Sequence, residues 1–226
     1  MSDTALVIMV RYPEKGKTKT RLAHSIGDEA TLGLYQAFLT DLAQHFVGWK
    51  YDLYWAYTPD DIDFSPFAAT LAPSYASTMC SFPQRGPDLG TRLHQVFLFL
   101  RAQQYQNIIV IGSDSPHIRR STILQAQQAL ASADVVLGPA EDGGYYLIAM
   151  RESYDVFSDI PMSTNVVLQL TTEKAQHQGL SVHLLESLFD VDELPELLRL
   201  AELLRVENIR APTTAMYLAH LESELL

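Results

Sequence analysis

Cysteine is nearly absent from the chain, because Cys80 is the only one among 226 residues. A single cysteine excludes an intramolecular disulfide and is typical of a reducing compartment. The longest apolar runs are far too short to cross a membrane, and the start, Met-Ser-Asp-Thr, lacks the basic region and long apolar core of a signal peptide. We therefore expect a cytoplasmic protein without a membrane span.

Basic residues are also scarce: 16 lysines and arginines stand against 27 aspartates and glutamates, for a net charge of −11. General nucleic-acid binding needs a basic field that replaces the counterions around phosphates, so we expect no nucleic-acid partner. A local positive patch suits a small anionic ligand, although a solvated basic loop would have the same composition. Such a patch lies within positions 11–21, formed by Arg11, Lys15, Lys17, Lys19 and Arg21.

Continuous apolar runs alternate with segments whose apolar residues recur at helical spacing, which predicts an α/β fold. Strands that are apolar throughout are buried on both faces, so the central sheet should be mostly parallel with helices on both faces. The last segment, 213–226, either packs on the body of the chain or forms the contact of a homodimer. The expected strands are 5–10, 51–57, 78–82, 107–111, 133–139, 145–150 and 181–185, and the expected helices are 19–24, 28–46, 89–105, 122–131, 163–178, 194–204 and 213–226.

The strand 107–111 runs directly into Gly112, Asp114 and Pro116. Glycine and proline end the strand and leave the Asp114 carboxylate at its carboxyl end, where open α/β sheets place their ligands. A carboxylate at that position is suited to a divalent metal. The alternative is that Asp114 only caps the helix that begins a few residues later.

A second candidate site is the segment Gly138-Pro-Ala-Glu-Asp-Gly-Gly-Tyr145. Gly143 and Gly144 permit backbone shapes and close ligand approach that other residues would block, and Asp142 precedes them. An Asp-Gly pair is also a common tight turn between strands. Because this turn again follows a buried strand, Asp114 and Asp142 are expected to face one crevice.

A third acidic group is Asp190-Val-Asp192, ahead of the helix expected at 194–204. If the sheet brings Asp192 beside Asp114, the pair supplies hard oxygen ligands for Mg²⁺ or Mn²⁺, with diphosphate oxygens and water completing the coordination. Capping of the following helix is the other explanation for Asp192.

Two helix starts carry further polar residues. Asp88 can cap the helix that begins at residue 89, and Arg92, one turn later, can reach an anion near the positive helix end; we favour the binding role. Ser163 and Thr164 form an N-cap signal for the helix 163–178. The seven histidines show no metal-ligand spacing, so none is assigned a role, and Cys80 is expected in the core.

Gly16-Lys17-Thr18, after the first strand, is similar to the end of a P-loop. A P-loop needs glycine at the position of Arg11, so that backbone N–H groups can wrap the phosphates, and Pro13 removes another donor. The loop instead suits phosphate binding by side chains.

Six motifs in chain order resemble one family. The chain is similar to the small bacterial GT-A-fold glycosyltransferases described as nucleotide-diphospho-sugar transferases, which include enzymes assigned to arsenosugar biosynthesis. It departs from the family pattern at Met162, where tryptophan is usual, and at Glu193, where threonine is usual. The motifs are Pro13-x-x-Gly-Lys-x-Lys-Thr-Arg-Leu-Ala23, Asp88-Leu-Gly-x-Arg-Leu93, Ile111-Gly-Ser-Asp-Ser-Pro116, Gly138-Pro-Ala-Glu-Asp-Gly-Gly-Tyr-Tyr146, Ser163-Thr164 and Asp190-Val-Asp192.

The resemblance implies a single GT-A-like domain with a nucleotide-binding half at about 1–116, an acceptor-side half at about 117–210 and a C-terminal helix at 213–226. It implies Mg²⁺ or Mn²⁺ at Asp114 and Asp192, with Asp142 as the candidate catalytic base. Nucleotide and phosphate contacts would come from Arg11, Lys17, Lys19, Arg21, Asp88 and Arg92, and acceptor contacts from Glu141, Gly143, Gly144, Tyr145, Ser163 and Thr164.

The expected activity is transfer of a sugar from a nucleotide-diphospho-sugar to a small-molecule acceptor. One alternative is a nucleotidyltransferase of the same fold, because Lys-Thr-Arg-Leu22 also resembles the basic loop of phospholactate guanylyltransferases. The other is a protein that binds nucleotides without catalysis. The sugar, base and acceptor do not follow from the sequence.

Overall fold

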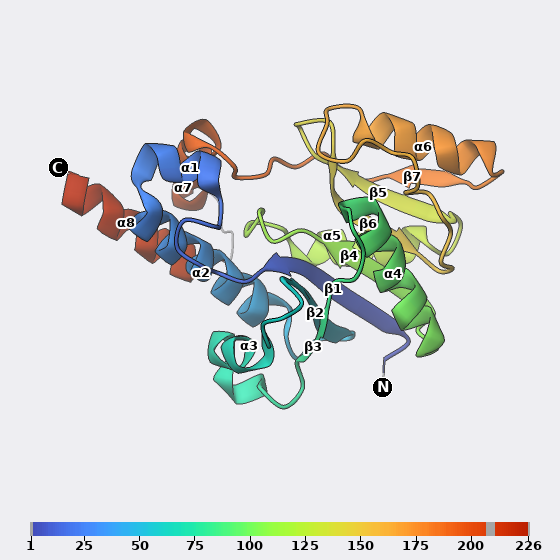
Figure 1. Ribbon diagram of the computed structural model, residues 1–226, viewed down its shortest axis with the longest axis horizontal. Helices are drawn as coiled ribbons and strands as arrows, with labels where there is room; N and C mark the ends of the chain where they lie inside the picture. The colour runs from blue at the N-terminus through green and yellow to red at the C-terminus, as the bar shows by residue number, and fades with distance from the viewer. Residues whose placement is uncertain (1, 207–210, 226) are drawn as a thin grey trace.

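A computed structural model of the chain describes residues 2–206 and 211–225. The chain alternates strands and helices, as the sequence predicts (Figure 1). The strands are β1 (Thr4–Arg11), β2 (Asp52–Thr58), β3 (Cys80–Pro83), β4 (Asn107–Ile111), β5 (Val135–Pro139), β6 (Tyr145–Met150) and β7 (Val182–Leu184). The helices are α1 (Thr20–Ile26), α2 (Asp28–Phe46), α3 (Ser65–Leu71), α4 (Leu89–Ala102), α5 (Arg120–Ala129), α6 (Val167–His177), α7 (Leu194–Val206) and α8 (Pro212–Leu225), with a 3-10 turn η1 (Pro73–Tyr75).

The strands form one sheet in the order β3-β2-β1-β4-β6-β5-β7. All pairs are parallel except those of β6, which runs antiparallel to both β4 and β5. From β1 the chain proceeds outward through β2 and β3, and then returns to β4 on the other side of β1. The carboxyl ends of β1 and β4 therefore form a topological switch point, which is where open α/β sheets bind ligands.

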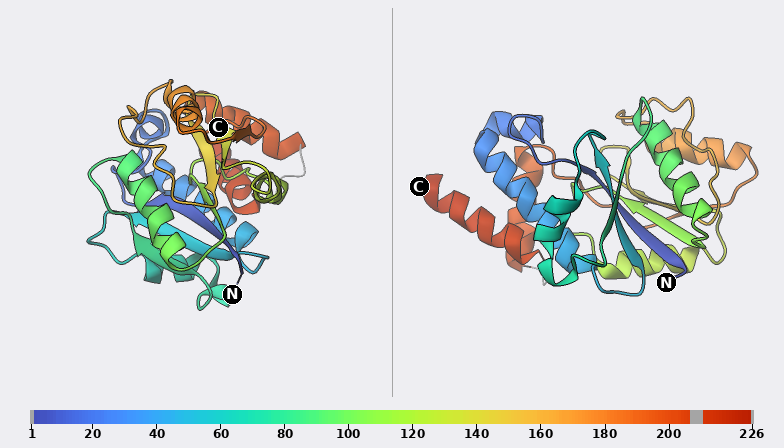
Figure 2. Two further views of the ribbon diagram at one scale, coloured as in Figure 1. Left: turned by 90° about the vertical axis from the view of Figure 1, so that its right-hand side faces the viewer. Right: turned by 60° about the horizontal axis from the view of Figure 1, so that its bottom comes forward.

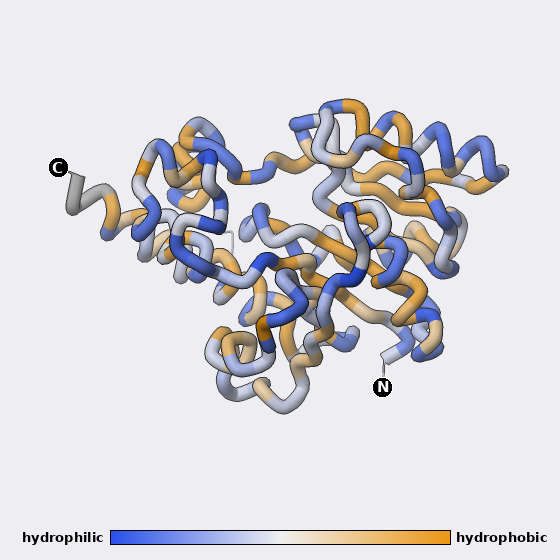
Figure 3. The backbone as a smooth tube through the Cα atoms, in the orientation of Figure 1, coloured by the Kyte–Doolittle hydropathy of each residue, from blue (hydrophilic) through white to orange (hydrophobic). Residues whose placement is uncertain are grey.

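The central strands are buried on both faces because their side chains alternate between two cores. Leu6 and Ile8 of β1 join the core beneath α2, α5 and α7, whereas Ala5 and Val7 join the core beneath α4 and α6. Figure 2 shows α2 and α4 on opposite sides of the sheet. Hydrophobic residues follow the strands and hydrophilic residues predominate between β1 and α1 (Figure 3). The predicted fold class, an α/β protein with a mostly parallel sheet covered on both faces, is confirmed.

The last helix, α8, packs on the body of the chain, against α2. The buried Asp41 carboxylate of α2 accepts hydrogen bonds from the backbone N–H groups of Thr213 and Thr214, at 3.0 and 2.7 Å. These are first-turn N–H groups that have no partner inside the helix, so Asp41 caps α8 from outside. Of the two expectations for this segment, the structure shows packing on the body of the chain. Residues 207–210 and 226 lie outside the described part of the chain.

Several local predictions are wrong. The sixth helix begins at Val167 rather than at the Ser163-Thr164 pair, which lies in the preceding loop, where Ser163 adopts a left-handed backbone. Cys80 is exposed rather than in the core, because it begins β3, a short strand at the edge of the sheet. None of the described helices is long and apolar enough to cross a membrane.

Candidate functional site

Four aspartates lie at the carboxyl edge of the sheet, at the switch point. Asp114 follows β4, Asp142 lies in the turn between β5 and β6, and Asp190 and Asp192 follow β7. The backbone holds these segments together, since Val191 N–H donates to the carbonyl oxygen of Asp114 at 3.0 Å. Asp114 does not cap α5, whose N-cap is Arg119 without a side-chain cap bond. The sequence thus identified an edge at which distant carboxylates meet.

A lysine ammonium fills the space between two of these carboxylates. Lys19 Nζ lies 2.5 Å from Oδ1 of Asp114 and 3.2 Å from Oδ1 of Asp192. It also donates to the carbonyl oxygen of Val191 at 2.7 Å, so all three of its N–H groups have acceptors. The Lys19 side chain is only 4% exposed, whereas the two carboxylates are nearly half exposed. The carboxylates therefore meet around a cation, and that cation belongs to the chain.

The backbone before α1 directs Lys19 into this position. Lys19 has φ 45° and ψ 51°, a left-handed conformation that is uncommon for residues other than glycine. Its Nζ lies 6.0 and 5.9 Å from the ring centroids of Tyr35 and Phe38 of α2. Burial alone would lower the pKa of Lys19, but Asp114 and Asp192 outweigh it and hold the pKa above its usual value. Lys19 is thus a permanent charge at neutral pH.

Asp190 has an environment unlike those of the other aspartates. Burial and the nearby charges of Asp114, Asp142 and Asp192 together raise its pKa to about 7, against the hydrogen bond from Ser115, which lowers it. Ser115 Oγ lies 2.5 Å from Oδ1 of Asp190 and 3.1 Å from the carbonyl oxygen of Phe189. A carboxyl group that titrates near neutral pH can accept or release a proton during catalysis.

The Asp142 turn is both a tight turn and part of a site. Oδ1 of Asp142 accepts from the backbone N–H of Gly144 at 2.9 Å, and Gly143 has φ 91°. A Cβ at Gly143 would lie 2.0 Å from the carbonyl oxygen of Asn165, so only glycine allows the two loops to touch. The turn therefore positions the loop that carries Ser163 and Thr164.

Four cavities adjoin the aspartates, and one of them, about 240 Å³, is lined by Asp114 and Asp190 together with Leu89 and Tyr145. The Asp114 cavity, about 260 Å³, is lined by Asp114 and Asp192 and also by Arg11, Thr18, Lys19, Tyr35, Gln84 and Ser113. The Asp142 cavity, about 420 Å³, is lined by Asp142, Asp190 and Asp192 and also by Arg21, Leu89, Gly144, Tyr145, Met162, Ser163, Thr164 and Asn165. The Arg199 cavity, about 480 Å³, is lined by Asp142, Asp190 and Asp192 and also by Arg21, Glu141, Phe189 and Arg199. One aspartate cluster thus borders spaces for more than one ligand or for the parts of a large one.

The predicted phosphate-binding residues separate into two groups. Arg11, Lys19 and Arg21 line the cavities, and Arg21 is exposed, with its guanidinium 4.0 Å from Glu193. Lys17 instead points to solvent and pairs with Glu14 at 2.9 Å, and Lys15 pairs with Glu29. The structure brings the first group to the aspartates and leaves the lysines 15 and 17 on an exposed loop.

Asp88 and Arg92 form hydrogen bonds with backbone groups near the start of α4. Asp88 accepts from the backbone N–H of Thr91 at 2.8 Å, which caps α4 and holds the Asp88 pKa below its usual value. Arg92 Nε donates to the carbonyl oxygen of Gly86 at 2.9 Å. Neither residue lines any of the four cavities, so the capping explanation accounts for Asp88.

The predicted acceptor-side residues gather at the Asp142 cavity, with the exceptions of Gly143 and Glu141. Gly144, Tyr145, Ser163 and Thr164 line that cavity. Glu141 turns away from it and forms a two-point ion pair with Arg199, at 2.6 and 2.9 Å. Sequence reasoning missed Asp190 as a titrating group, although its place two residues before Asp192 was a usable signal; Ser115 and Gln84 carried no such signal.

A divalent metal fits this site only together with a bound molecule that supplies further oxygen donors. Among the residues described, no group of three or more histidine, cysteine, aspartate or glutamate side chains is arranged to hold a metal ion. Asp114 and Asp192 do supply two hard oxygen donors around one cation position. Mg²⁺ is often bound by one or two carboxylates, with phosphates and water as its other ligands. The pair fits such an ion together with a phosphate-bearing molecule, provided that Lys19 moves aside.

Known proteins resemble the chain in sequence and in structure. A structure from Desulfovibrio desulfuricans, provisionally described as a nucleotide-diphospho-sugar transferase, is 33% identical over 99% of this chain and 96% of that chain, with a TM-score of 0.90. A 4-diphosphocytidyl-2C-methyl-D-erythritol synthase from Anaerococcus prevotii is 8% identical over 90% of this chain and 96% of that chain, with a TM-score of 0.58. A cytidylyltransferase from Leptospira borgpetersenii is 11% identical over 100% of this chain and 96% of that chain, with a TM-score of 0.54. The last two share the fold alone.

A search of curated proteins finds no match. A family model described as "Uncharacterized protein conserved in bacteria (DUF2064)" matches residues 43–164, which include the β4 end with Asp114 and the Asp142 turn. The chain shares its fold with these structures, and it belongs to the bacterial family DUF2064.

Proposed function

We propose that the protein is a metal-dependent glycosyltransferase that moves a sugar from a nucleotide-diphospho-sugar to a small-molecule acceptor. The observation that carries the proposal is the meeting of Asp114, Asp192 and the Lys19 ammonium between two cavities at the switch point of the sheet. The description of the 33% identical structure from Desulfovibrio desulfuricans agrees with this activity.

The donor would lie in the Asp114 cavity. Its diphosphate would face Arg11, Lys19 and Arg21, whose positive charges line that cavity and its neighbour. Cations aimed at the leaving diphosphate stabilise the negative charge that develops as the sugar bond breaks. Lys19 already has two carboxylates as partners, so its transfer to a phosphate would free Asp114 and Asp192.

These two carboxylates are the proposed ligands of Mg²⁺ or Mn²⁺. When bound, such an ion would supply further electrostatic stabilisation of the leaving diphosphate. The carboxylates are nearly half exposed and open to the cavity, which suits an ion that shares its coordination with a ligand and water.

The acceptor would lie in the Asp142 cavity, between the Asp142 turn and the Ser163–Asn165 loop. Its hydroxyl oxygen would form the new bond to the sugar carbon, and its proton would pass to a carboxylate. Asp142 and Asp190 both line the cavity. The pKa of Asp190, raised to about 7, makes it a proton acceptor that is half available at neutral pH, and adds it to Asp142 as a candidate base.

The test separates sugar transfer from nucleotidyl transfer on the same fold. Purified protein is incubated with a panel of nucleotide sugars or nucleoside triphosphates, with Mg²⁺ or Mn²⁺, and both nucleoside diphosphate and pyrophosphate are followed. Nucleoside diphosphate released from a nucleotide sugar is the expected result. Pyrophosphate released from a triphosphate would instead establish the nucleotidyltransferase alternative.

A binding measurement covers the case in which the acceptor is missing from the assay. Nucleotide sugar with Mn²⁺ should raise the melting temperature of the wild type but not that of Asp114→Ala. Asp134→Asn is the matched control, because its carboxylate is also hydrogen-bonded but lies at the amino end of β5, at the opposite edge of the sheet. If neither nucleotide sugars nor triphosphates shift the wild type, the proposed function is wrong.

A further inference from the structure

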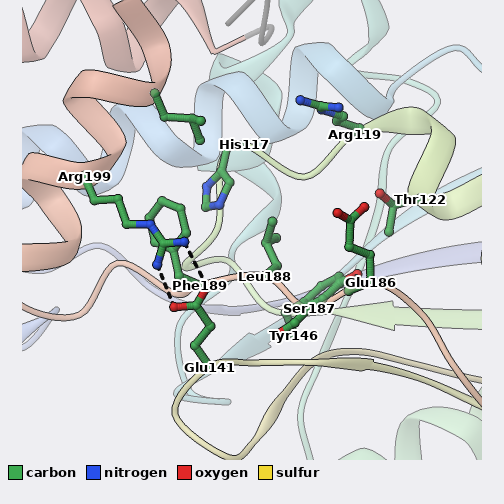
Figure 4. A pocket seen from close by; sticks show the side chains of 11 residues that line it. His117, Arg119, Thr122, Glu141, Tyr146, Glu186, Ser187, Leu188, Phe189 and Arg199 are labelled. Atoms are coloured by element: carbon green, nitrogen blue, oxygen red, sulfur yellow. Dashed lines mark hydrogen bonds and ion pairs between the residues drawn. The ribbon is translucent and has the colours of Figure 1, made fainter. Parts of the chain in front are cut away.

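A cavity of about 200 Å³ lies on the face of the sheet that carries α5 and α7. We call it the His117 cavity; it shares Glu141, Phe189 and Arg199 with the Arg199 cavity, but none of the four aspartates lines it. Figure 4 shows its side chains coming from the loop after β4, from α5, from the Asp142 turn, from the segment after β7 and from α7. No step of the proposed transfer uses it.

His117 is the unusual feature of this cavity. It is 2% exposed, and neither of its ring nitrogens has a hydrogen-bond partner among the described residues. Its ring packs against Phe189, with centroids 4.3 Å apart, and lines the cavity with both nitrogens covered, so a ligand reaches them only when the ring turns (Figure 4). A buried polar atom without a partner typically costs about 1–3 kcal/mol, so a ligand that pairs both nitrogens would regain that free energy.

The imidazole is neutral at physiological pH. Burial and the positive charges of Arg199 and Arg119 together lower the pKa of His117 to about 4, against Glu141, which raises it. A neutral imidazole has one N–H donor and one acceptor nitrogen. A partner for both must accept one hydrogen bond and donate another.

The charged groups around the cavity cancel. Arg119 and Arg199 stand against Glu141 and Glu186, and Arg199 is already held by Glu141 and by the ring of Phe189, 4.1 Å from its guanidinium carbon. A charged ligand would therefore gain little from the net field. Hydroxyl groups, by contrast, can donate to the carboxylates and accept from the guanidinium groups.

The volume limits the size of the ligand. A water molecule occupies roughly 30 Å³ in the liquid, so the cavity has room for about seven waters, or for one small ring with its hydroxyls. Thr122 and Ser187 add two more hydroxyl partners to its wall.

We propose that the His117 cavity binds a small uncharged polyol of about monosaccharide size, whose hydroxyls donate to one ring nitrogen of His117 and accept from the other. This site stands on the unpaired imidazole and the balanced charges of its wall, independently of the proposed function.

The experiment titrates the ¹⁵N-labelled full chain with myo-inositol and with D-glucose, and separately with inorganic phosphate and acetate. Long-range ¹H–¹⁵N spectra report the ring nitrogens of His117, whose signal is the one missing from His117→Phe. We expect a polyol to move these nitrogens with a dissociation constant in the millimolar range or below, and to bind at least tenfold more weakly to His117→Phe. His183→Phe, an exposed position in β7, should bind as the wild type does.

Each other outcome overturns the proposal. A response to phosphate or acetate but not to the polyols would show an anion site. No response to any of the four probes would show that the cavity is not a site for this class. Equal polyol affinity in the His117→Phe and wild-type proteins would place binding elsewhere. His117→Gln assigns the signal if the phenylalanine variant does not fold.

Discussion

Lys19 and Asp114 lie 2.5 Å apart, from Nζ to Oδ1, and join the residue that precedes α1 to the loop that follows β4. The lysine is almost fully covered and the carboxylate is open to the cavity, so the pair presents its negative side to a ligand. The ammonium keeps Asp114 and Asp192 together while no other cation is bound. It also competes with any cation that would take its place.

Replacing this cation should make the cluster dependent on metal. Without the ammonium, Lys19→Met leaves two facing carboxylates, which we expect to cost about 1–3 kcal/mol. For a domain of this size, 1 kcal/mol corresponds to roughly 2–4 °C in melting temperature. Millimolar Mn²⁺ should then stabilise Lys19→Met more than the wild type, measured by thermal unfolding against an EDTA baseline.

Lys17→Met is the control for this prediction, since Lys17 is exposed and pairs only with Glu14 at the surface. It should melt with the wild type and respond to Mn²⁺ as the wild type does. An equal Mn²⁺ response in Lys19→Met and the wild type would show that Asp114 and Asp192 do not attract a divalent ion when the lysine is gone.

Part of this arrangement was predictable from sequence, for a physical reason. Strands buried on both faces are continuous apolar runs, and their carboxyl ends share one edge, so residues 114 and 142 could be placed near one another, whereas the approach of residue 192 to residue 114 stayed a condition. The position of Lys19 could not be predicted, because it depends on a left-handed backbone and on contacts 95 and 173 positions along the chain. Lys17 and Lys19 both belong to the same run of cations two positions apart, yet Lys17 points to solvent.

The sequence also did not show which side chains cap which helices. Asp41 lies inside an amphipathic pattern and gives no sign that it caps a helix 172 positions later. Ser163-Thr164 has the composition of a cap but serves the loop beside Gly143, whose contact with Asn165 is a tertiary effect. His117 likewise has no metal-ligand spacing, and only the packed structure shows that its nitrogens lack partners.

The buried His117 should make stability depend on pH. Its pKa of about 4 in the folded state lies below the usual 6.5, so the folded protein binds fewer protons than the unfolded chain between these values. The stability is complete above pH 6.5 and is lost as the pH falls toward 4, by at most about 3 kcal/mol from one group. Burial acts with Arg199 and Arg119 in this direction and Glu141 acts against them.

Denaturant unfolding from pH 7.5 to pH 4.5 checks this dependence. His117→Phe retains the ring against Phe189 without a titrating group, so its stability should fall less than that of the wild type over the same range. If the free energy of unfolding falls equally with pH in the two proteins, the pKa of His117 does not differ between the folded protein and the unfolded chain.

Asp41 should contribute more than a surface cap. Asp41→Ala leaves the N–H groups of Thr213 and Thr214 without their acceptor in a buried place, which should cost about 1–3 kcal/mol. Asp63→Ala removes a comparable bond, from the backbone N–H of Ser65 at 2.9 Å, at an exposed helix start and should cost less. Urea unfolding of both variants gives the comparison, and an equal loss would show that α8 does not depend on α2 for its cap.

Gly143 offers a test of how the Asp142 turn supports the acceptor side. Gly143→Ala would place a Cβ 2.0 Å from the carbonyl oxygen of Asn165, so the turn and the loop of residues 163–165 must separate. Gly179→Ala is the matched control: its φ is 76°, similarly left-handed, but nothing lies within 4 Å of the added Cβ.

Both substitutions strain the backbone, by about 1 kcal/mol, and should lower the free energy of unfolding. Only Gly143→Ala should also reduce transfer activity, by at least tenfold, with the larger part in the KM for the acceptor because the Asp142 cavity changes shape. Steady-state kinetics beside urea unfolding separates the two effects. If Gly179→Ala loses as much activity as Gly143→Ala, the loss reflects stability, and the contact between the two loops does not shape the acceptor site.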